Sequence, residues 1–524
     1  MEVQPILVAG EWRKATATAT FVAENPATGK VLDATFPVSG WEDCDAALTA
    51  AAGAAKELRG VPAERLAEFL ELYAGEIEKH AEALVAIAHV ETGLPVTPRL
   101  RDVELPRTTT QLRQGAAAAR EGSWTKAVID TKNNIRSHYA PIGPVVIFGP
   151  NNFPFAFNGI SGGDLAAAVA AGNTVIAKGH PFHPGTTKLL AECAFTALKQ
   201  TGLPSGTIQM LYNISKEDGL RLVSDERVGA ISFTGSRLGG LSLKEAADKA
   251  GKPIYLEMSS LNPVVILPGA FRERGEGLAV ELADSCLAAA GQFCTSPNLI
   301  FVIGEEDADR LATGLVAILE ERTPGYLLSG SGLKSLDDSV HALIAAGAKV
   351  ATGASKLDRE GYRYKNTLLR VSAEKFLNAT HELQREAFGN STMLVTMKDV
   401  GQLCEVIDSL EGNLTGSIYS SRAGEDDAIY PAIAGALRVK VGRLLNDKMP
   451  TGVALSAAMN HGGPFPATSH PGFTAVGIPA SMTRFAALHC YDNVRQERLP
   501  AVLQDKSPNP AMWRLVEGAW VRGD

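Results

Sequence analysis

The amino-acid sequence predicts an α/β protein built from more than one domain. From residue 143 to residue 258, short apolar segments alternate with helix-forming segments, which is typical of a parallel sheet covered by helices. A second alternating stretch runs from about residue 263 to residue 446 and predicts a second α/β domain. The chain has 524 residues, more than one hydrophobic core usually organises, so its length agrees with two or more domains.

Helices are expected before the first sheet, because residues 42–120 carry apolar side chains at helical spacing and glycines where helices stop. In the first sheet, strands and helices are expected to alternate, beginning with a strand, over 143–149, 163–172, 173–179, 185–204, 206–212, 216–225, 228–235, 236–251 and 253–258. In the second domain, strands are expected at 263–269, 298–304, 391–397, 416–421 and 441–446, with a helix at 278–291. Extended arms are expected near 133–145 and 484–494, and "NPAMWRLVEGAW" indicates a short amphipathic helix.

The composition excludes several classes of protein. Hydrophobic residues make up 45% and charged residues 21%, as in a typical soluble globular protein. The net charge of −8, without a basic block, argues against a nucleic-acid partner. The N-terminus lacks a signal-peptide pattern and no apolar run approaches the length of a bilayer, so no membrane partner is expected. The six cysteines form no C-x-x-C pair, which predicts a cytoplasmic protein with neither a metal site nor a disulfide framework.

The pattern Gly-Gln-apolar-Cys occurs twice, as "GQFC" and as "GQLC". Cys404, in the second copy, falls on the apolar stripe of a predicted helix and is expected to be a packing residue, as are Cys193 and Cys286. Cys294, in the first copy, follows Gly291, which is expected to stop a helix, and precedes a strand. A side chain in such a connection can face a cleft, so Cys294 is either a packing residue or a nucleophile.

Polar groups that a nucleophile would need follow the ends of predicted strands. Asn152 in "GPNNFP" has an amide that can donate to an oxyanion, although asparagine-rich loops also form turns. Glu257 closes an apolar strand and is placed as a general base, although an ordinary solvated strand end fits as well. "TGSRLGG" forms a glycine-rich turn into a helix N-terminus, a setting that suits a phosphate.

Seven motifs, taken in order, resemble the aldehyde dehydrogenase superfamily: "GPNNFPF", "KGHP", "FTGSRLGG", "LEMSSLNP", "GQFCTSPN", "EAFG" and "GRLLN". The resemblance covers about residues 25–495. It implies a Rossmann-type cofactor domain, an α/β catalytic domain and a small β oligomerisation arm through which copies form a homodimer or homotetramer. The implied boundaries are 1–132 and 146–262 for the cofactor domain, 263–455 for the catalytic domain, 133–145 and 484–500 for the arm, 456–483 for a return segment and 501–524 for a C-terminal tail. Cys490 would lie in the arm.

The same resemblance assigns roles to the site residues. The nucleophile is Cys294, the general base is Glu257, and the oxyanion donor is Asn152. The implied reaction is NAD(P)-dependent oxidation of an aldehyde through a cysteine thiohemiacetal and a thioester, which a water activated by Glu257 then hydrolyses. The residues expected to contact the cofactor are Lys178, His180, Thr234, Gly235, Ser236, Gly240, Glu386 and Phe388.

The cofactor is expected to be NADP, with NAD as the alternative. An acidic residue after the second strand would bind both ribose hydroxyls and repel a 2′-phosphate. The motif "KGHP" offers Lys178 and His180 and no carboxylate. Lys216 follows the next strand and adds positive charge, unless it is only a solvated residue at a helix start.

Departures from the family pattern indicate a particular branch. The sequence has Glu-Met-Ser-Ser where the family usually has Glu-Leu-Gly-Gly, and Leu299 stands where an arginine is common. Together with "HGGPFPATSHPGFTAVG", these departures resemble bacterial 2-oxoglutarate semialdehyde (2,5-dioxopentanoate) dehydrogenases and the NADP-dependent fatty aldehyde dehydrogenase of luminous bacteria. The implied substrate is 2-oxoglutarate semialdehyde, in sugar-acid or hydroxyproline catabolism, or else a medium- or long-chain aliphatic aldehyde.

Two kinds of side chain can select between these small-molecule aldehydes. A distal carboxylate needs a cation, and Arg107 or Arg113 in "ELPRTTTQLR" can supply it, although each can equally be a solvated or structurally paired arginine. Phe155, Phe157 and Phe465 can line an apolar channel for a longer aldehyde, although core packing explains them as well.

A cysteine hydrolase that works without nicotinamide is the rival from a different class. It would need a histidine beside Cys294. Among the seven motifs only "KGHP" contains a histidine, His180, which the resemblance places at the cofactor ribose.

Overall fold

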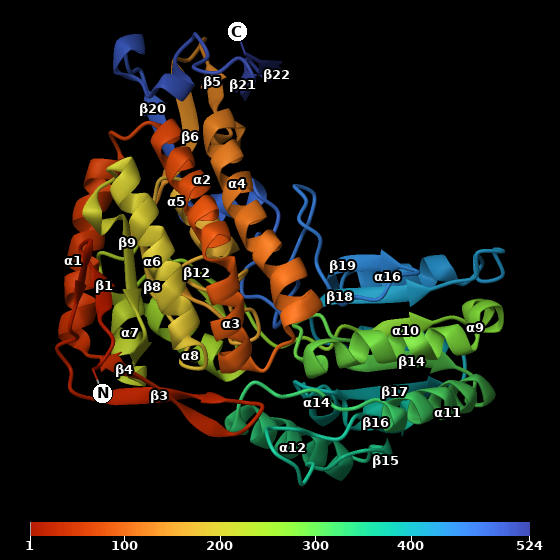
Figure 1. The fold of residues 1–524 in the computed structure, drawn as a ribbon. Coiled ribbons are helices and arrows are strands. Elements are labelled where there is room, and N and C mark those ends of the chain that lie inside the picture. The colour runs from red at the N-terminus through yellow and green to blue at the C-terminus, as the bar shows by residue number, and fades with distance from the viewer. Residues whose placement is uncertain (1, 524) are drawn as a thin grey trace.

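Four β-sheets organise the computed structural model, which describes residues 2–523 (Figure 1). The first sheet has seven strands in the order β12-β11-β7-β8-β9-β1-β2. Its strands are β1 (Ile6–Val8), β2 (Glu11–Arg13), β7 (Val145–Phe148), β8 (Val175–Lys178), β9 (Ile208–Leu211), β11 (Ala230–Thr234) and β12 (Ile254–Glu257). Strands β12 to β9 are parallel, whereas β1 and β2 add an antiparallel edge. The alternation predicted between residues 143 and 258 is therefore confirmed.

Both faces of the parallel strands are covered by helices. Every residue of β7 and β9 is buried, which is why these strands read as continuous apolar runs rather than as alternating patterns. Helix α5 packs on β7 and β8, α1 packs on β8, β9 and β1, and α8 packs on β12. The helices of this half are α1 (Trp41–Leu58), α2 (Ala63–Lys79), α3 (Ala81–Thr92), α4 (Leu105–Glu121), α5 (Gly163–Ala170), α6 (Pro184–Thr201), α7 (Lys216–Ser224) and α8 (Arg237–Lys249).

The second sheet also has seven strands, in the order β15-β16-β17-β14-β13-β18-β19. Its strands are β13 (Val264–Ile266), β14 (Leu299–Ile303), β15 (Lys349–Thr352), β16 (Thr367–Ser372), β17 (Ser391–Met397), β18 (Asn413–Tyr419) and β19 (Val441–Asn446). Only β15 is antiparallel to its neighbour. The helices around this sheet are α9 (Pro268–Arg274), α10 (Glu276–Leu287), α11 (Glu305–Glu321), α12 (Gly330–Ala345), α13 (Ala373–Asn378), α14 (Thr380–Leu383), α15 (Val400–Asp408) and α16 (Tyr430–Arg438).

The N-terminal region contains strands that the sequence patterns do not single out. Strands β3 (Thr20–Asn25) and β4 (Lys30–Ser39) form an antiparallel pair, and β10 (Asn213–Ile214) adds to β4 as a third strand. Most residues of β3 are exposed or half-buried, so the strand lacks the apolar alternation that would predict it.

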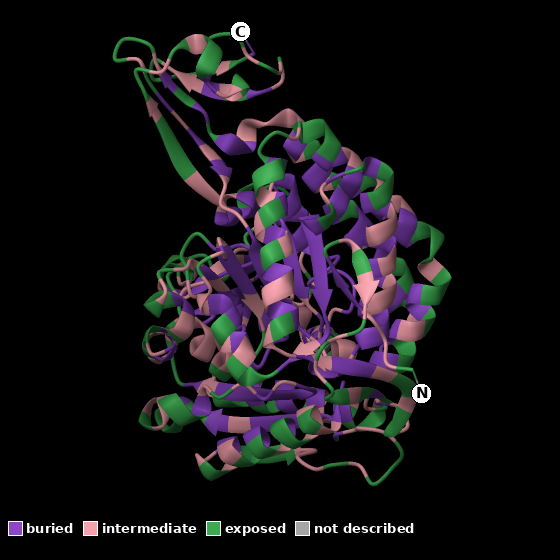
Figure 2. Cartoon of the chain, turned by 90° about the vertical axis from the view of Figure 1, so that its left-hand side faces the viewer, coloured by how far each residue is buried: buried purple, intermediate pink, exposed green. Residues whose placement is uncertain are grey.

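A five-stranded sheet forms an arm that stands out from the body of the molecule (Figure 2). Its strands are β5 (Val128–Asp130), β6 (Ile135–Pro141), β20 (Ala486–Asp492), β21 (Trp513–Val516) and β22 (Ala519–Arg522). The extended arms expected near 133–145 and 484–494 are confirmed, because β6 and β20 pair along their whole lengths. Strand β5 also belongs to this sheet, although it precedes the boundary expected at residue 133.

The helix expected over "NPAMWRLVEGAW" is wrong, because this segment forms the β21–β22 hairpin. The two residues between the strands, Glu517 and Gly518, have φ values of 49° and 79°. Positive φ at both central residues is the geometry of a tight hairpin turn, which matches the twist of the strands. The leucine of β21, Leu515, also donates its N–H to the carbonyl of Ala127, which fixes the hairpin onto the arm. No helix within residues 2–523 is both long and apolar enough to cross a membrane.

Candidate active site

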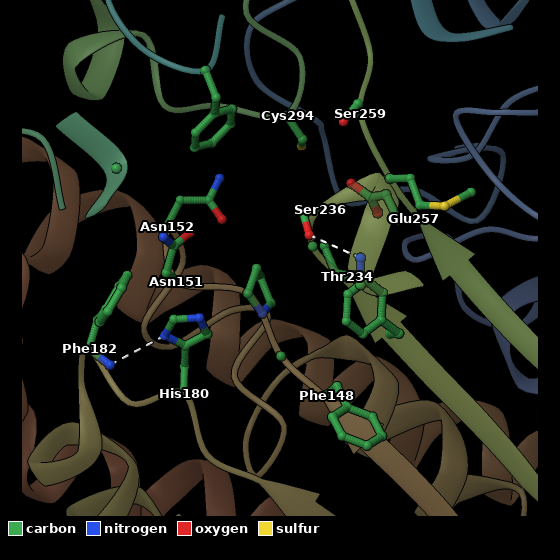
Figure 3. Close-up of a pocket in the computed structure, with 18 of the residues that line it drawn as sticks. Phe148, Asn151, Asn152, His180, Phe182, Thr234, Ser236, Glu257, Ser259 and Cys294 are labelled. Carbon is green, nitrogen blue, oxygen red and sulfur yellow. Dashed lines mark hydrogen bonds between the residues drawn. The ribbon is translucent and has the colours of Figure 1, made fainter. Parts of the chain in front are cut away.

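The carboxyl ends of the parallel strands open into a cavity of about 610 Å³ that both halves of the chain line (Figure 3). From the first sheet come the loops after β7, β8, β11 and β12, and from the second half come Cys294, residues of α12 and the loop before β17. Many of the site residues that the sequence predicts line this cavity: Asn152, Lys178, His180, Thr234, Gly235, Ser236, Glu257, Cys294, Glu386 and Phe388.

Cys294 is presented by a tightly held loop. Helix α10 ends at Leu287, four residues before the stop expected at Gly291. A left-handed turn follows, in which Ala289, Ala290 and Gly291 have φ values of 49°, 54° and 72°. A Cβ at Gly291 would lie 2.1 Å from the carbonyl oxygen of Gly389, so this position requires glycine.

The backbone after Cys294 is fixed as well. The side-chain amide of Asn262 donates to the carbonyls of Cys294 and Ser296, each at 2.9 Å. The other cysteines differ from this one: Cys44, Cys193 and Cys286 are buried within helices, Cys404 is half-buried on α15 and Cys490 is exposed on β20. The expected packing role is therefore confirmed for Cys193 and Cys286, and Cys294 is the cysteine that faces the cavity.

The thiol of Cys294 lies beside a buried histidine and a buried carboxylate. His461 Nε2 lies 3.4 Å from Cys294 Sγ and 3.1 Å from Glu257 Oε1. Burial, followed by the negative charge of Glu257, raises the pKa of the Cys294 thiol well above its ordinary value, and the nearby Arg443 guanidinium opposes this shift. A group that removes the thiol proton is therefore needed before the sulfur can attack, and His461 and Glu257 are in place for this task.

His461 was not identified from the sequence. It lies in the segment between β19 and β20, where its backbone N–H donates to the Thr474 hydroxyl and its carbonyl accepts from Ala475. Its side chain is buried. The only available signal was its place at the start of "HGGPFPATSHPGFTAVG", because no local spacing links it to Cys294.

Asn152 lies in the loop that follows β7, and hydrogen bonds to neighbouring residues hold this loop in place. Its side-chain amide donates to the carbonyl of Gln292 at 2.8 Å, two residues before the cysteine. Arg99 donates to the carbonyl of Asn152 at 2.9 Å and forms a buried ion pair with Glu104, which in turn accepts from the N–H groups of Phe155 and Ala156. Because one amide N–H is used on Gln292, the second can donate to an oxyanion that forms on a substrate at Cys294.

Glu257 ends β12, next to β11 in the sheet, and its side chain is almost completely buried. Oε1 contacts His461, whereas Oε2 has no hydrogen-bond partner among the described residues. A buried carboxylate with a free oxygen beside a thiol is suited to accept a proton from a water or from the thiol.

Two basic side chains line the far end of the cavity. Lys178, at the end of β8, forms no ion pair with any residue of 2–523, and burial lowers its pKa to about 8. Burial, followed by the neighbouring His183 and Lys178, lowers the pKa of His180 well below its ordinary value. The carboxylates that line the cavity are Glu257 and Glu386, so no acid stands beside these two side chains at the end of β8.

The turn after β11 gives the cavity a helix N-terminus. The Ser236 hydroxyl caps α8 by accepting from the N–H of Gly239, which also lines the cavity (Figure 3). Gly240 does not line the cavity: it lets α8 approach β12, since a Cβ there would lie 3.0 Å from Met258 Sδ. Lys216, the first residue of α7, is exposed and also lies outside the cavity lining. Burial raises the pKa of Glu386, which also lines the cavity, to about 7.

Two partly unpaired arginines lie near Cys294. Arg107 on α4 donates to the carbonyl of Val453, and its Nε and Nη2 atoms are buried without a partner among the described residues. Arg443 on β19 donates to the carbonyls of Pro450 and Gly452, and its Nε is unpartnered in the same way. Burial lowers the pKa of Arg107 to about 10 and also lowers that of Arg443, and both guanidinium groups interact electrostatically with the Cys294 thiol.

The remaining substrate candidates lie elsewhere. Arg113 forms an exposed two-bond ion pair with Glu78, at 2.6 and 2.8 Å, which is the structurally paired alternative. Phe155 is fully buried in the core, and Phe465 is 58% exposed beside Arg237, so neither position supports a role in a substrate channel. Phe157 lies between the Arg107 guanidinium and the His461 ring, with centroid distances of 5.7 and 6.0 Å.

The comparisons with known proteins agree with this geometry. The Aldehyde dehydrogenase family model matches residues 12–452. Alpha-ketoglutaric semialdehyde dehydrogenase 2 of Azospirillum brasilense is 36% identical, over 99% of each chain, and alpha-ketoglutaric semialdehyde dehydrogenase of Acinetobacter baylyi is 35% identical, over 95% of this chain and 96% of the relative. The NAD⁺ complex of aldehyde dehydrogenase from Bacillus cereus superposes with a TM-score of 0.80 at 21% identity, covering 94% of this chain and 96% of that one. The chain belongs to the aldehyde dehydrogenase family.

Proposed function

We propose that this aldehyde dehydrogenase is a cytoplasmic enzyme that oxidises 2-oxoglutarate semialdehyde, with NADP as the preferred cofactor. The observation that carries the substrate is the pair Arg107 and Arg443, whose unpartnered N–H groups are buried near the nucleophile. The activity named for the two relatives supports the same substrate.

The physical argument concerns the cost of burying a cation. A guanidinium group that loses water without gaining an anion is costly, and the lowered pKa of Arg107 expresses that cost. The distal carboxylate and adjacent keto oxygen of 2-oxoglutarate semialdehyde would accept hydrogen bonds from these donors while its aldehyde end reaches Cys294. An aliphatic aldehyde would leave these N–H donors unpaired, so the semialdehyde that carries a carboxylate is favoured.

The first step places the aldehyde carbon on Cys294 Sγ. The thiol proton passes to the Glu257 carboxylate, which releases it to solvent before the later hydrolysis step, while His461 Nε2 lies 3.4 Å from the sulfur and 3.1 Å from Glu257 Oε1. The oxyanion of the thiohemiacetal accepts from the second amide N–H of Asn152, which the Arg99–Glu104 pair holds in position through the loop backbone.

The second half of the reaction needs a hydride acceptor, which a bound nicotinamide supplies. The cavity fits a nicotinamide dinucleotide: Phe388 and Glu386 line it together with Cys294, the α8 N-terminus suits a pyrophosphate, and Lys178 lacks an ion-pair partner among residues 2–523. Glu257 then takes a proton from a water that hydrolyses the thioester, and the free Oε2 is positioned for this role.

An aldehyde panel tests the proposal. The purified enzyme is mixed with NADP or NAD and with 2-oxoglutarate semialdehyde, succinate semialdehyde, propanal or decanal, and reduced nicotinamide is followed by absorbance. We expect the highest kcat/KM with 2-oxoglutarate semialdehyde. A higher value with decanal would assign the enzyme to long-chain aldehydes instead. His461 supplies the histidine that a cysteine hydrolase would need, but this rival is not favoured, because the family model and the two semialdehyde dehydrogenase relatives support aldehyde oxidation.

Removing a buried arginine is expected to change substrate choice rather than overall activity. For Arg107→Met, we expect kcat/KM for 2-oxoglutarate semialdehyde to fall about 30- to 1,000-fold, because the substrate carboxylate loses a desolvated charge partner. The value for propanal should change less than about threefold. Arg113→Met is the matched control on the same helix, since that arginine is exposed and paired with Glu78. Equal losses for both aldehydes would contradict a role in carboxylate recognition.

The preference for NADP rests on the basic end of the cavity. In Lys178→Ala we expect the KM for NADP to rise about tenfold or more and the KM for NAD to rise less, because the ammonium group pairs with the additional phosphate. Lys216→Ala serves as the comparison, since this exposed residue lies outside the cavity and should shift both constants little. Equal increases for the two cofactors in Lys178→Ala would remove the argument for NADP.

We also propose that the arm mediates a homodimer or homotetramer. The five-stranded sheet stands clear of the body and exposes Leu488 (61%) and Trp520 (60%), a surface that a second copy would cover (Figure 2). Light scattering coupled to gel filtration should give two or four chains per particle, and a monomer would refute the assembly.

A further inference from the structure

We propose that Cys294, His461 and Glu257 form a binding site for a zinc ion, and that bound zinc holds the enzyme in a reversible inactive state. The sequence predicts no metal site, and these three residues are far apart in the chain and match no metal-ligand spacing. The structure brings one sulfur, one imidazole nitrogen and one carboxylate oxygen within 4.8 Å of one another.

The distances fit a single tetrahedral ion. With Zn–S near 2.3 Å and Zn–N and Zn–O near 2.0–2.2 Å, two ligand atoms of a tetrahedral site lie about 3.4–3.6 Å apart. The observed separations are 3.4 Å between Cys294 Sγ and His461 Nε2 and 3.1 Å between His461 Nε2 and Glu257 Oε1. Small side-chain rotations are therefore enough to place all three atoms around one ion.

The surroundings favour a metal over water as the partner of these atoms. His461 and Glu257 are almost completely buried, and Glu257 Oε2 has no partner within residues 2–523. An unpartnered buried carboxylate oxygen gains an interaction when a cation arrives. A thiolate, a neutral imidazole and a carboxylate are the ligand types that zinc prefers, and the fourth position would face the cavity.

Binding involves no redox change. The Cys294 thiol loses its proton to solvent, the Sγ–Zn bond forms, and His461 and Glu257 donate lone pairs to the ion. The zinc then binds the sulfur that would attack the aldehyde and the carboxylate that would activate water, so neither group is free to react. Loss of activity follows from this occupancy, and removal of the ion restores both groups.

Cobalt(II) is the probe, because its spectrum reports both thiolate ligation and four-coordinate geometry. We expect the full-length enzyme to bind one Co²⁺ per chain, with a sulfur-to-cobalt charge-transfer band and intense visible bands, and Zn²⁺ to displace it. In His461→Asn, which keeps the thiol, we expect affinity to fall more than about tenfold. Cys490→Ala and Cys404→Ala should leave the spectrum unchanged, since these cysteines lie outside the cavity.

Several results would overturn the site. These are a spectrum that disappears in Cys490→Ala, a six-coordinate spectrum without the charge-transfer band, or an unchanged affinity in both His461→Asn and Glu257→Gln. The two variants are used together so that a folding defect in one, checked by circular dichroism, does not decide the matter. Because cobalt binding is measured without aldehyde or cofactor, a failed substrate proposal leaves this test intact.

The inactive state has its own measurement. Stoichiometric Zn²⁺ should abolish oxidation of whichever aldehyde the panel identifies, and a chelator should restore at least about nine-tenths of the rate. Full activity with zinc bound, or a loss that a chelator does not reverse, would refute the inactive state.

Discussion

Replacing Cys294 with alanine is expected to abolish aldehyde oxidation, with kcat/KM falling by at least about 10⁴-fold. No other described cysteine lines the cavity, and neither His461 nor Glu257 can form the thiohemiacetal from which hydride leaves. The measurement is the steady-state appearance of reduced nicotinamide with 2-oxoglutarate semialdehyde and with propanal.

The control for this variant is its ability to bind cofactor. Quenching of protein fluorescence by NADPH should be unchanged in Cys294→Ala, because Lys178 and the α8 N-terminus remain in place. Cys404→Ala, at a half-buried position on α15, should keep full activity. If Cys294→Ala retained more than about one hundredth of the wild-type rate, covalent catalysis at this position would be wrong.

Replacing Glu257 with glutamine is expected to stop the reaction after one turnover. Glutamine has nearly the same shape but cannot take a proton from water, so thioester hydrolysis should slow about 10²- to 10⁴-fold. Rapid mixing should show a burst of about one reduced nicotinamide per chain, followed by a slow steady state, and mass spectrometry should detect the acylated enzyme.

The burst separates two roles for this carboxylate. Glu257 contacts both His461 and the thiol, so it can act in proton removal from Cys294 as well as in water activation. A missing burst, with the first turnover as slow as the later ones, would show that the earlier proton transfer is the step that depends on Glu257. Both results are compared with those of Glu386→Gln, which replaces a second carboxylate of the cavity that acts on the thiol through its charge alone.

The parts of the site that lie at strand ends were accessible from the sequence. Asn152 follows an apolar strand and Glu257 ends one, and parallel strands bring their carboxyl ends to one edge of a sheet. Cys294 follows a helix stop, although the helix ends earlier than expected because Ala289 and Ala290 adopt left-handed conformations that their side chains do not predict.

Residues that reach the site by tertiary folding alone were missed. His461 lies in the return segment, which has no periodic pattern that points toward Cys294. Arg443 lies on β19, a strand that the sequence predicts, but the pattern does not show that its side chain acts on Cys294. The two predicted arginines, Arg107 and Arg113, lie on one helix but have different partners, which the sequence does not reveal. Arg107 donates to a loop carbonyl, whereas Arg113 pairs with Glu78. The tail was mistaken for a helix because the turn at Glu517 interrupts an apolar pattern that also fits a hairpin.

The order of strands in the arm has a consequence for synthesis on the ribosome. Strands β5 and β6 emerge early, but their partners β21 and β20 come from the last forty residues or so of the chain. The hydrogen-bonding edges of β5 and β6 therefore remain open while the rest of the polypeptide is made and folds. Nascent chains therefore carry a β5–β6 hairpin whose two outer edges stay unpaired throughout elongation, and these edges are where a chaperone or a neighbouring nascent chain would act first.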